Sequence, residues 1–506
     1  EGSRITGATY TTVNATIPVT FIMAAITAIL GVILGLWIMK SHTLEGSAPI
    51  AARASEALKA WKVPTVAIVV SLVLTVAWPV LLQRFRVNPN AQEMESTYIQ
   101  RNIDATRAAY GLDKVKAEQY KATTEGEEGA LADSAESTAQ IRLLDPQIIS
   151  PTFKQLQQSK QYYTFADTVA VDKYDVDGVS QDTVIAAREL DLDGLDNRNW
   201  VNDHTVYTHG YGVVAAYGNK VTADGQPEFF ESGIPTQGKL TESEKYEPRI
   251  YFSPNTTEYS IVGAPEGTQA WEFDYPTGSE GATNTFKGDG GPKIGNIFSR
   301  LLYAIRFGSD QILFSDRVTS ESQILYDRSP KERVAKVAPY LTLDGRVYPA
   351  VVDGRVKWIV DGYTTSDAYP YSQMTDLGSA TKDSTTVSSA TVSSLGSQKA
   401  NYIRNSVKAT VDAYDGSVDL YVWDQSDPVI KAWEKIFPGQ YHQLSDISGD
   451  LMSHMRYPES LFKVQRELLA KYHVSSANQF FSGEDFWQTP VDPTESQQAQ
   501  QRDILQ

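Results

Sequence analysis

Residues 19–39 read VTFIMAAITAILGVILGLWIM, which is 21 residues without a charged side chain. A second uncharged run, VPTVAIVVSLVLTVAWPVLL, occupies residues 63–82. A helix needs about 20 apolar residues to cross the hydrocarbon core of a bilayer. We therefore expect the two runs to form a transmembrane helical hairpin. A buried hairpin in a soluble fold is the alternative.

The connection between the two runs, residues 40–62, is basic. It carries four cations against two acids: Lys40, Arg53, Lys59 and Lys62 against Glu45 and Glu56. Cytoplasmic loops of membrane proteins are enriched in Lys and Arg. We therefore expect this loop in the cytoplasm and everything after residue 86 on the outer side. The expected location is the cell membrane, in a multi-pass protein whose large domain is extracytoplasmic.

Gly31 and Gly35 lie four residues apart in the first run. Such pairs of small residues let a second membrane helix approach closely. The expected partners are membrane lipids, other membrane proteins or further helices of the same protein. The ordinary glycine content of a membrane helix explains the pair equally well.

The rest of the chain is acidic and contains no cysteine. Residues 87–506 hold 38 Lys and Arg against 59 Asp and Glu. Because an acidic surface repels phosphates, nucleic acid is not an expected partner. Without cysteine, the chain has no disulfides, thiolate metal sites or cysteine nucleophiles.

Hydrophobic periodicity after residue 86 alternates between helix-like and strand-like segments, which predicts an α+β fold. Helices are expected at 91–112, 293–307, 330–339, 401–413, 428–437 and 458–472. Strands are expected at 183–190, 207–217, 249–253, 259–263, 270–275 and 417–423, with a meander of short strands at 341–365. Residues 121–140 are expected to be a mobile acidic loop.

The expected organisation has five parts. They are an extracytoplasmic lead-in (1–17), the transmembrane hairpin with its cytoplasmic loop (18–86), an extracytoplasmic α+β domain (87–375), a disordered Ser/Thr-rich loop (376–398) and a mainly helical extracytoplasmic region (399–506).

The densest cluster of polar and aromatic residues is NWVNDHTVYTHGYG at 199–212. Asp203, His204 and His209 within it are candidate ligands of a metal or another molecule. However, residues five apart share neither a helix face nor a strand face. A structural role, with the imidazoles bonded to backbone in a turn, is favoured.

A second candidate binding loop is DGYTTSDAYPYS at 361–372. Asp361, Tyr363, Tyr369 and Tyr371 supply aromatic faces and polar groups that suit sugars or peptides. The same residues would equally suit packing across a domain interface.

Three glycine-containing motifs are weaker candidates. DVDG at 175–178 and DLDGLD at 191–196 resemble fragments of calcium loops, but no glutamate closes either one, so turns are favoured. GDGGP at 288–292 precedes a predicted helix; a flexible helix entry is favoured over an anion site. No cofactor is expected, and calcium or another divalent cation is the alternative.

Four longer motifs together resemble a known family. WVNDHTVYTHGYG (200–212), WIVDGYTTS (358–366), NYIRNSVK (401–408) and HMRYPESLF (454–462) are similar to uncharacterised protein family 0182, a set of large bacterial membrane proteins. The resemblance implies further transmembrane helices before this chain and more exported sequence after it. It implies no reaction and no catalytic residues.

These features favour an envelope membrane protein with an extracytoplasmic scaffold or binding domain, working in assembly or transport of envelope material. One alternative is an extracytoplasmic hydrolase or transferase acting on cell-wall glycan, peptide or lipid. That interpretation requires residues 199–212 and 361–372 to meet in one cleft. A further alternative is part of a transporter.

Overall fold

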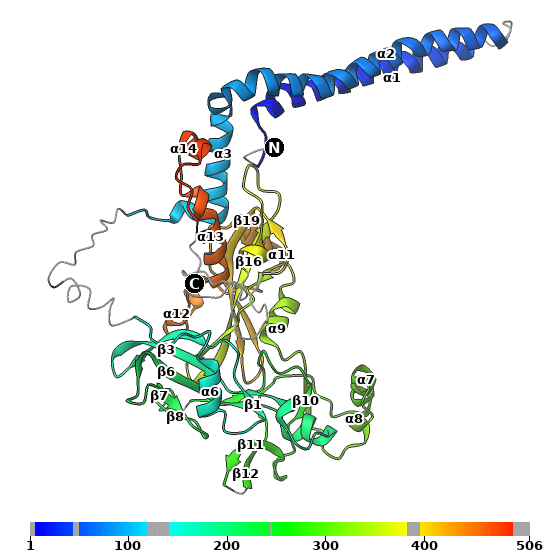
Figure 1. Ribbon diagram of the computed structural model, residues 1–506. Coiled ribbons are helices and arrows are strands. Elements are labelled where there is room, and N and C mark those ends of the chain that lie inside the picture. The colour runs from blue at the N-terminus through cyan, green and yellow to red at the C-terminus, as the bar shows by residue number, and fades with distance from the viewer. Residues whose placement is uncertain are drawn as a thin grey trace.

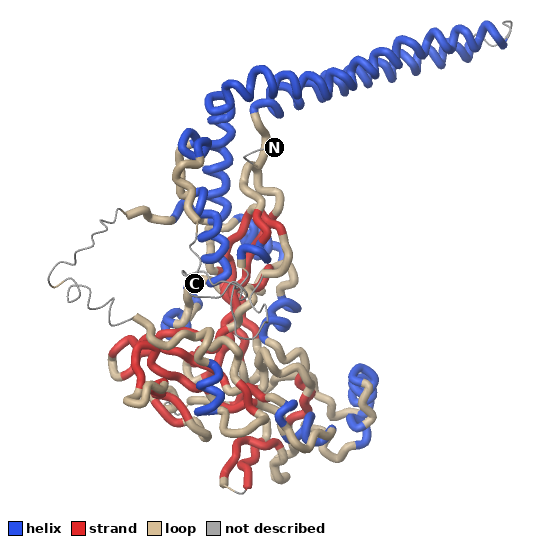
Figure 2. The backbone as a smooth tube through the Cα atoms, viewed as in Figure 1, coloured by secondary structure: helices blue, strands red, loops and turns tan. Residues whose placement is uncertain are grey.

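A computed structural model describes residues 6–43, 50–118, 129, 141–242, 245–278, 280–381 and 395–488. Two paired helices project as a long rod from an elongated body of strands and helices (Figure 1). The strands gather in the body, and the described residues of the rod are helical (Figure 2). Two long apolar helices near the N-terminus and a mixed α/β body are thus confirmed.

The rod consists of α1 (Ile17–Thr43) and α2 (Ile50–Leu82). Both contain a stretch long and apolar enough to cross a membrane. Their apolar side chains face outward: Phe21 is 73% exposed and Val76 66%. The core helix of a soluble fold would bury such residues, so these helices do not belong to the buried core.

The chain turns sharply after α2 and enters α3 (Ala91–Tyr110), which runs along the body (Figure 1). The turn contains a π-helical segment (Gln83–Val87) and a 3-10 segment (Asn88–Asn90). α3 packs with α13 (Glu459–Tyr472) and α14 (Ala477–Ser482). The Tyr110 hydroxyl donates to the Ala400 carbonyl over 2.8 Å. The base of the rod is thereby joined to the body through a packed helix.

Two antiparallel five-stranded sheets form the centre of the body. The first runs in the order β2 (Ala170–Val176), β3 (Val179–Ala187), β6 (Val213–Val221), β7 (Pro227–Ser232), β8 (Gln237–Gly238). The second contains β14 (Thr342–Leu343), β15 (Tyr348–Val352), β16 (Arg355–Ser366), β19 (Tyr402–Asp412) and β20 (Val418–Val422), with β14 and β15 both paired to β16.

Aspartate–glycine pairs close two of the hairpins, as expected. Asp177 and Gly178 join β2 to β3, and Asp353 and Gly354 join β15 to β16; all four have positive φ. This conformation is the one that tight hairpin turns demand, and Asp and Gly tolerate it.

The main core lies between the two sheets. Val213 and Ala215 from the first pack with Trp358 and Val360 from the second, all buried. α9 (Pro330–Val337) and α11 (Pro428–Ile436) close the core, and each begins with proline, which suits a first helical position. The helices predicted in these two regions, and those corresponding to α3 and α13, are confirmed.

Shorter elements make up the rest of the body. The strands are β1 (Tyr163–Thr164), β4 (Glu189–Leu190), β5 (Gly210–Tyr211), β9 (Arg249–Ile250), β10 (Ser260–Val262), β11 (Glu272–Thr277), β12 (Glu280–Asn284) and β13 (Gln323–Leu325). The helices are α6 (Ser150–Gln157), α7 (Ile297–Phe307), α8 (Gln311–Phe314) and α12 (Gly449–Ser453).

The helix predicted at 401–413 is wrong, because this segment is the central strand β19. β19 pairs with β16 on one side and β20 on the other, and nearly every residue is buried. A strand buried on both faces loses the alternation by which strands are recognised. Among the described residues after 398, the strands β18, β19 and β20 come first and the helices follow from α11 onward.

The two low-complexity segments differ in what the structure describes. Of the predicted loop 121–140, only Gly129 is among the described residues. The ends of segment 376–398 are ordered, contrary to expectation: β17 (Thr375–Asp376) pairs with β18 (Lys399–Ala400), and α10 (Leu377–Ala380) follows directly. Leu377 and Leu395 are buried, which holds both ends in place. Residues 382–394 lie outside the described residues.

Candidate functional site

Asp203 and His204 lie in a π-helical turn (Asn202–Val206) and both are engaged locally. The Asp203 carboxylate accepts from Arg198 Nε over 3.0 Å. The His204 ring stacks on Tyr259 with 3.9 Å between centroids, and its Nδ1 lies 2.7 Å from the Tyr259 carbonyl oxygen. These contacts fix the turn against β10.

His209 is completely enclosed. Its Nδ1 lies 2.9 Å from the Gly210 carbonyl oxygen, and its ring packs on Tyr251. Burial lowers the pKa of His209 to about 4, so the ring is neutral at physiological pH. Nε2 lies 3.8 Å from Asp274 Oδ1 and has no hydrogen-bond partner among the described residues.

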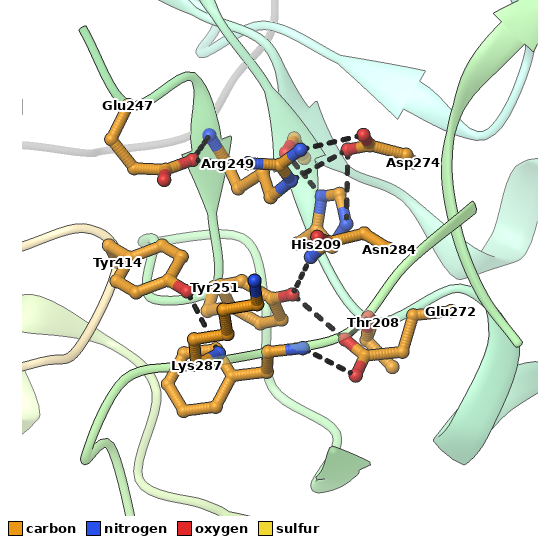
Figure 3. Close-up of polar contacts among 12 residues, drawn as sticks. Thr208, His209, Glu247, Arg249, Tyr251, Glu272, Asp274, Asn284, Lys287 and Tyr414 are labelled. Atoms are coloured by element: carbon orange, nitrogen blue, oxygen red, sulfur yellow. Dashed lines mark hydrogen bonds and ion pairs between the residues drawn. The ribbon is translucent and has the colours of Figure 1, made fainter. Parts of the chain in front are cut away.

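Figure 3 shows that His209 belongs to a polar network with Asp274, Arg249 and Glu247. Arg249 holds Asp274 through two hydrogen bonds of 2.9 and 2.8 Å and reaches Glu247 over 3.0 Å. The arrangement ties β9 to β11.

Glu272 forms the other half of this network (Figure 3). Its carboxylate accepts from the hydroxyls of Tyr251 and Thr208 and from the backbone amides of Gly263 and Phe286, over 2.8 to 3.2 Å. Burial nevertheless raises the pKa of Glu272. Four donors on one buried carboxylate link four chain segments, which is a structural role.

The Tyr-rich segment lies against β19 and α3. Asp361 is buried and paired with Lys408, and the Tyr363 hydroxyl donates to Asp344 over 2.5 Å. Tyr369 stacks on Tyr402 at 5.4 Å. The Tyr371 carbonyl accepts from Asn102 of α3 over 2.6 Å. This segment is therefore packed between elements, which was the alternative to a binding loop.

Residues 199–212 and 361–372 thus contact different parts of the body. The first segment packs on β10 and β11, and the second on β19 and α3. We call residues 199–212 the histidine cluster and residues 361–372 the Tyr-rich segment. No contact among the described residues joins the two, so the described residues do not form the shared cleft that the hydrolase interpretation requires.

The aspartate–glycine motifs form turns. Asp175 Oδ1 accepts from the Gly178 amide over 2.7 Å, and the Asp191 carboxylate caps Asp193. Across the ranges that the structure describes, no group of three or more His, Asp or Glu is placed to hold a metal.

The glycine-rich segment 288–292 is not a flexible helix entry. The amides of Gly290 and Gly291 donate to Gln323 Oε1 over 3.1 and 3.3 Å. A Cβ on Gly291 would lie 2.1 Å from the Ile324 carbonyl oxygen. These glycines permit close packing against β13, and α7 begins later, at Ile297.

Gly31 and Gly35 have open surroundings. Among the residues whose side chains the structure describes, nothing lies within 4 Å of a Cβ built on either glycine. Their role in helix packing stays a prediction.

One cavity of the body lies between the two sheets, beside the start of α9. It has a volume of about 800 Å³, within the range of ligand sites. Its lining includes aromatic, cationic and anionic side chains, among them Glu189, Asn255, Lys331, Tyr348, Trp358 and Arg456. Neither His209 nor Asp361 lines it.

The arginines of the cavity are already engaged. Arg142 makes two 3.0 Å hydrogen bonds to Asp182, and Arg346 lies 2.8 Å from both Glu459 oxygens. Arg456 donates to the Val171 carbonyl over 2.9 Å and lies 3.7 Å from the Tyr348 ring centre. These contacts hold the three arginines in place along the wall of the cavity.

Glu189 and Lys331 also line the cavity. Glu189 is only 1% exposed, and its Oε2 accepts from the Asn255 amide over 2.8 Å. Burial raises the pKa of Glu189 to about 7. Burial also lowers the pKa of Lys331, an effect that Asp344 opposes. Neither side chain has an ion-pair partner within 4.0 Å among the described residues.

Sequence reasoning missed both residues, because neither belongs to a motif. The available signal was the Arg188–Glu189 pair at the end of a predicted apolar strand, TVIAAREL at 183–190. Charged residues are rarely buried without a specific reason. Arg188 is fully buried and donates to the carbonyls of Gln157 and Tyr211.

These features describe a protein with an α+β body that has a cavity between its two sheets. A packed helix joins this body to two helices that are long and apolar enough to cross a membrane. Comparison with known sequences gives the family. The chain belongs to the Uncharacterised protein family (UPF0182), whose sequence model matches residues 1–504. The resemblance seen in the four motifs is confirmed.

The chain is similar to UPF0182 proteins of several bacteria. It is 96% identical to one from Bifidobacterium adolescentis, over all of this chain and 47% of that protein. The relative in Bifidobacterium longum is 89% identical, over all of this chain and 48% of its own length. One from Arthrobacter sp. is 52% identical, over 99% of this chain and 49% of that protein. The chain thus spans about half the length of these relatives. No solved structure matches it.

Proposed function

We propose that this protein is an integral membrane protein of the bacterial envelope, whose body lies outside the cytoplasm and binds a small polar ligand for assembly or transport of envelope material. The main support for this proposal is a contrast between the rod and the body. The rod exposes apolar side chains, whereas the body has a buried apolar core and a cavity lined by charged groups. Moving apolar surface from water into hydrocarbon is favourable, which makes the rod a membrane anchor.

The basic residues of segment 40–62 support this orientation. Lys40 lies in the last turn of α1, and Arg53, Lys59 and Lys62 lie in the first half of α2. If this end of the helix pair lies in the cytoplasm, α3 and the body lie outside, because α3 follows the opposite end of α2.

The absence of cysteine allows a direct test of orientation. Ser445→Cys places one thiol on an exposed site of the body, and Ser47→Cys places one in the segment that joins α1 to α2. A membrane-impermeant maleimide should label Ser445→Cys in intact cells and Ser47→Cys only after permeabilisation. The reverse pattern would place the body in the cytoplasm. Extraction of the protein by alkaline carbonate would refute the anchor itself.

The cavity supports a binding role because Glu189 and Lys331, two ionisable groups in it, have no ion-pair partner within 4.0 Å among the described residues. Lys331 offers a donor for an anionic oxygen, and the start of α9 adds the positive end of a helix dipole. Glu189 can accept from a hydroxyl, or donate when protonated. We infer a ligand that carries both a hydroxyl and an anionic oxygen, such as a sugar acid or a sugar phosphate.

Native mass spectrometry of the protein, purified from its own membranes in mild detergent, tests this inference. We expect a retained small molecule that is lost in Lys331→Ala and kept in Lys160→Ala, a control at an exposed lysine outside the cavity. An adduct that persists equally in both variants would place the ligand elsewhere. A wild-type protein without an adduct, even after incubation with glucose 6-phosphate or glucuronate, would count against the site.

A second candidate function is acid–base catalysis in the same cavity, which the pKa of about 7 at Glu189 favours. The two functions differ in the effect of Glu189→Gln. In a binding protein, any ligand that this variant retains would have the same mass as the ligand of the wild type, whereas an enzyme would accumulate an unreacted substrate of different mass.

A further inference from the structure

α7 is apolar on two opposite sides. At 3.6 residues per turn, one face carries Ile297, Phe298, Leu301, Leu302 and Ile305. Phe307 lies on the opposite side, and Ala304 lies between Phe307 and the edge of the first face. Phe307 stacks on Tyr259 at 4.4 Å, and Ala304 is buried in the same cluster. The second face attaches α7 to the body.

The first face is exposed. The exposed fractions of its five side chains lie between 43 and 71%, and Phe314 of the adjoining α8 is 80% exposed. We call these six residues the α7–α8 apolar patch. Scattered exposed apolar residues are common, but a contiguous patch of this kind marks a surface that contacts a protein or a membrane.

The position of the patch favours contact with a membrane over contact with a protein. α7 and α8 project from the body toward the side to which α1 and α2 point, beyond α9 and α11 (Figure 1). If α1 and α2 span a bilayer, its outer surface faces this side of the body. Position along the rod axis decides whether a segment can reach that surface.

The charge of α7 fits a lipid surface. The helix contains Arg300 and Arg306 and no acidic residue, although acids outnumber bases by 59 to 38 after residue 86. Arg306 is exposed beside the patch, whereas Arg300 lies on the side that faces the body, where it donates to the carbonyls of Ile294 and Gly295. Interfacial helices combine an apolar face with basic flanks that attract anionic headgroups.

We propose that the α7–α8 apolar patch inserts into the outer leaflet of the bilayer that α1 and α2 span. This inference rests on the proposed membrane anchor. It gives the body a second membrane contact, far along the chain from the first. Two separated contacts would hold the body at a fixed tilt and keep the inter-sheet cavity at a defined height above the lipid.

Fluorescence quenching in proteoliposomes tests the insertion. Ile305→Cys is labelled with the environment-sensitive dye NBD, and the protein is reconstituted into phosphatidylcholine and phosphatidylglycerol. Lipids spin-labelled near the headgroup should quench this dye more than lipids labelled deep in the acyl chain. Val32→Cys, in the anchor, should be quenched more by the deep label, and Ser445→Cys by neither.

Each outcome separates the two proposals. Quenching at 32 but none at 305, with a water-like emission at 305, would overturn the insertion and leave the anchor standing. A blue-shifted but unquenched dye at 305 would show that protein covers the patch, which also overturns it. If the dye at 32 escapes quenching, the anchor fails and the insertion falls with it.

Discussion

Lys408 of β19 and Asp361 of β16 face each other as register partners and form an ion pair that is buried on both sides. The Lys408 ammonium also donates to the Arg456 carbonyl over 2.7 Å and lies near the Trp423 ring. The Asp361 carboxylate, a candidate ligand-binding group from the sequence, thus forms an ion pair within the second sheet.

Replacing one member of this pair should be costly, because the other charge stays buried without a partner. We expect Lys408→Met to lower the free energy of unfolding by about 3 to 5 kcal/mol. The double variant Lys408→Met/Asp361→Asn should recover part of this loss. Urea unfolding of the purified protein measures both values.

The matched control for this experiment is the exposed pair Lys154–Asp167. Lys154→Met should change the free energy of unfolding by less than about 1 kcal/mol. A double variant no more stable than Lys408→Met alone would show that the two charges are not coupled.

His209 should make the protein acid-sensitive. Its pKa is about 4 in the folded protein and near 6.5 in an unfolded chain. Between these values the unfolded state binds more protons, so stability falls as pH falls from 6.5 to 4, by up to about 3 kcal/mol. Melting temperatures at pH 7 and pH 5 should therefore differ less in His209→Gln than in the wild type. His442→Gln, at an exposed side chain, is the matched control for the substitution itself.

The helices and hairpins of the fold were largely predictable from local signals. Proline at the first position and periodic apolar residues predict the helices α9 and α11. The Asp353–Gly354 turn is specified by residues that tolerate positive φ. In these places local chemistry and tertiary structure agree, so a single sequence suffices.

The inter-sheet cavity was not predictable, because it arises from contacts between distant segments. Glu189 and Lys331 are more than a hundred residues apart, and neither local sequence indicates a site. β19 was mistaken for a helix for a related reason: burial on both faces is set by its neighbours β16 and β20. The histidine cluster was a candidate site because it contains many polar groups. In the structure, His204 and His209 each contact a backbone carbonyl through Nδ1.

Gly291 should tolerate no side chain. Its Cβ would meet the Ile324 carbonyl oxygen at 2.1 Å, and a backbone atom in a paired strand cannot move aside easily. We expect Gly291→Ala to lower the free energy of unfolding by about 1 to 3 kcal/mol. Gly449→Ala is the control, because open space surrounds that position. Equal melting temperatures for the two variants would show that β13 shifts without cost.

Glu189 should destabilise the protein at alkaline pH. Its pKa is about 7 in the folded protein against an ordinary value of 4.5, so the folded state binds more protons between these values. This contribution to stability is present below pH 4.5 and is lost as pH rises through 7. At pH 8 the wild type holds a buried carboxylate without a cationic partner among the described residues, and Glu189→Gln removes this charge. We expect this variant to be more stable than the wild type at pH 8 by up to about 3 kcal/mol, and nearly equal to it below pH 4.5.

Melting curves at pH 4.5 and pH 8 for the wild type, Glu189→Gln and the exposed control Glu266→Gln measure this effect. A gain that is equal at both pH values would mean that the charge of Glu189 is not the cause. A gain confined to pH 8 would show that the fold carries a carboxylate at a cost to its own stability. Natural proteins commonly accept such a cost where a site needs the group for function. The result would therefore strengthen the case that the inter-sheet cavity, rather than the histidine cluster, is where this protein binds its ligand.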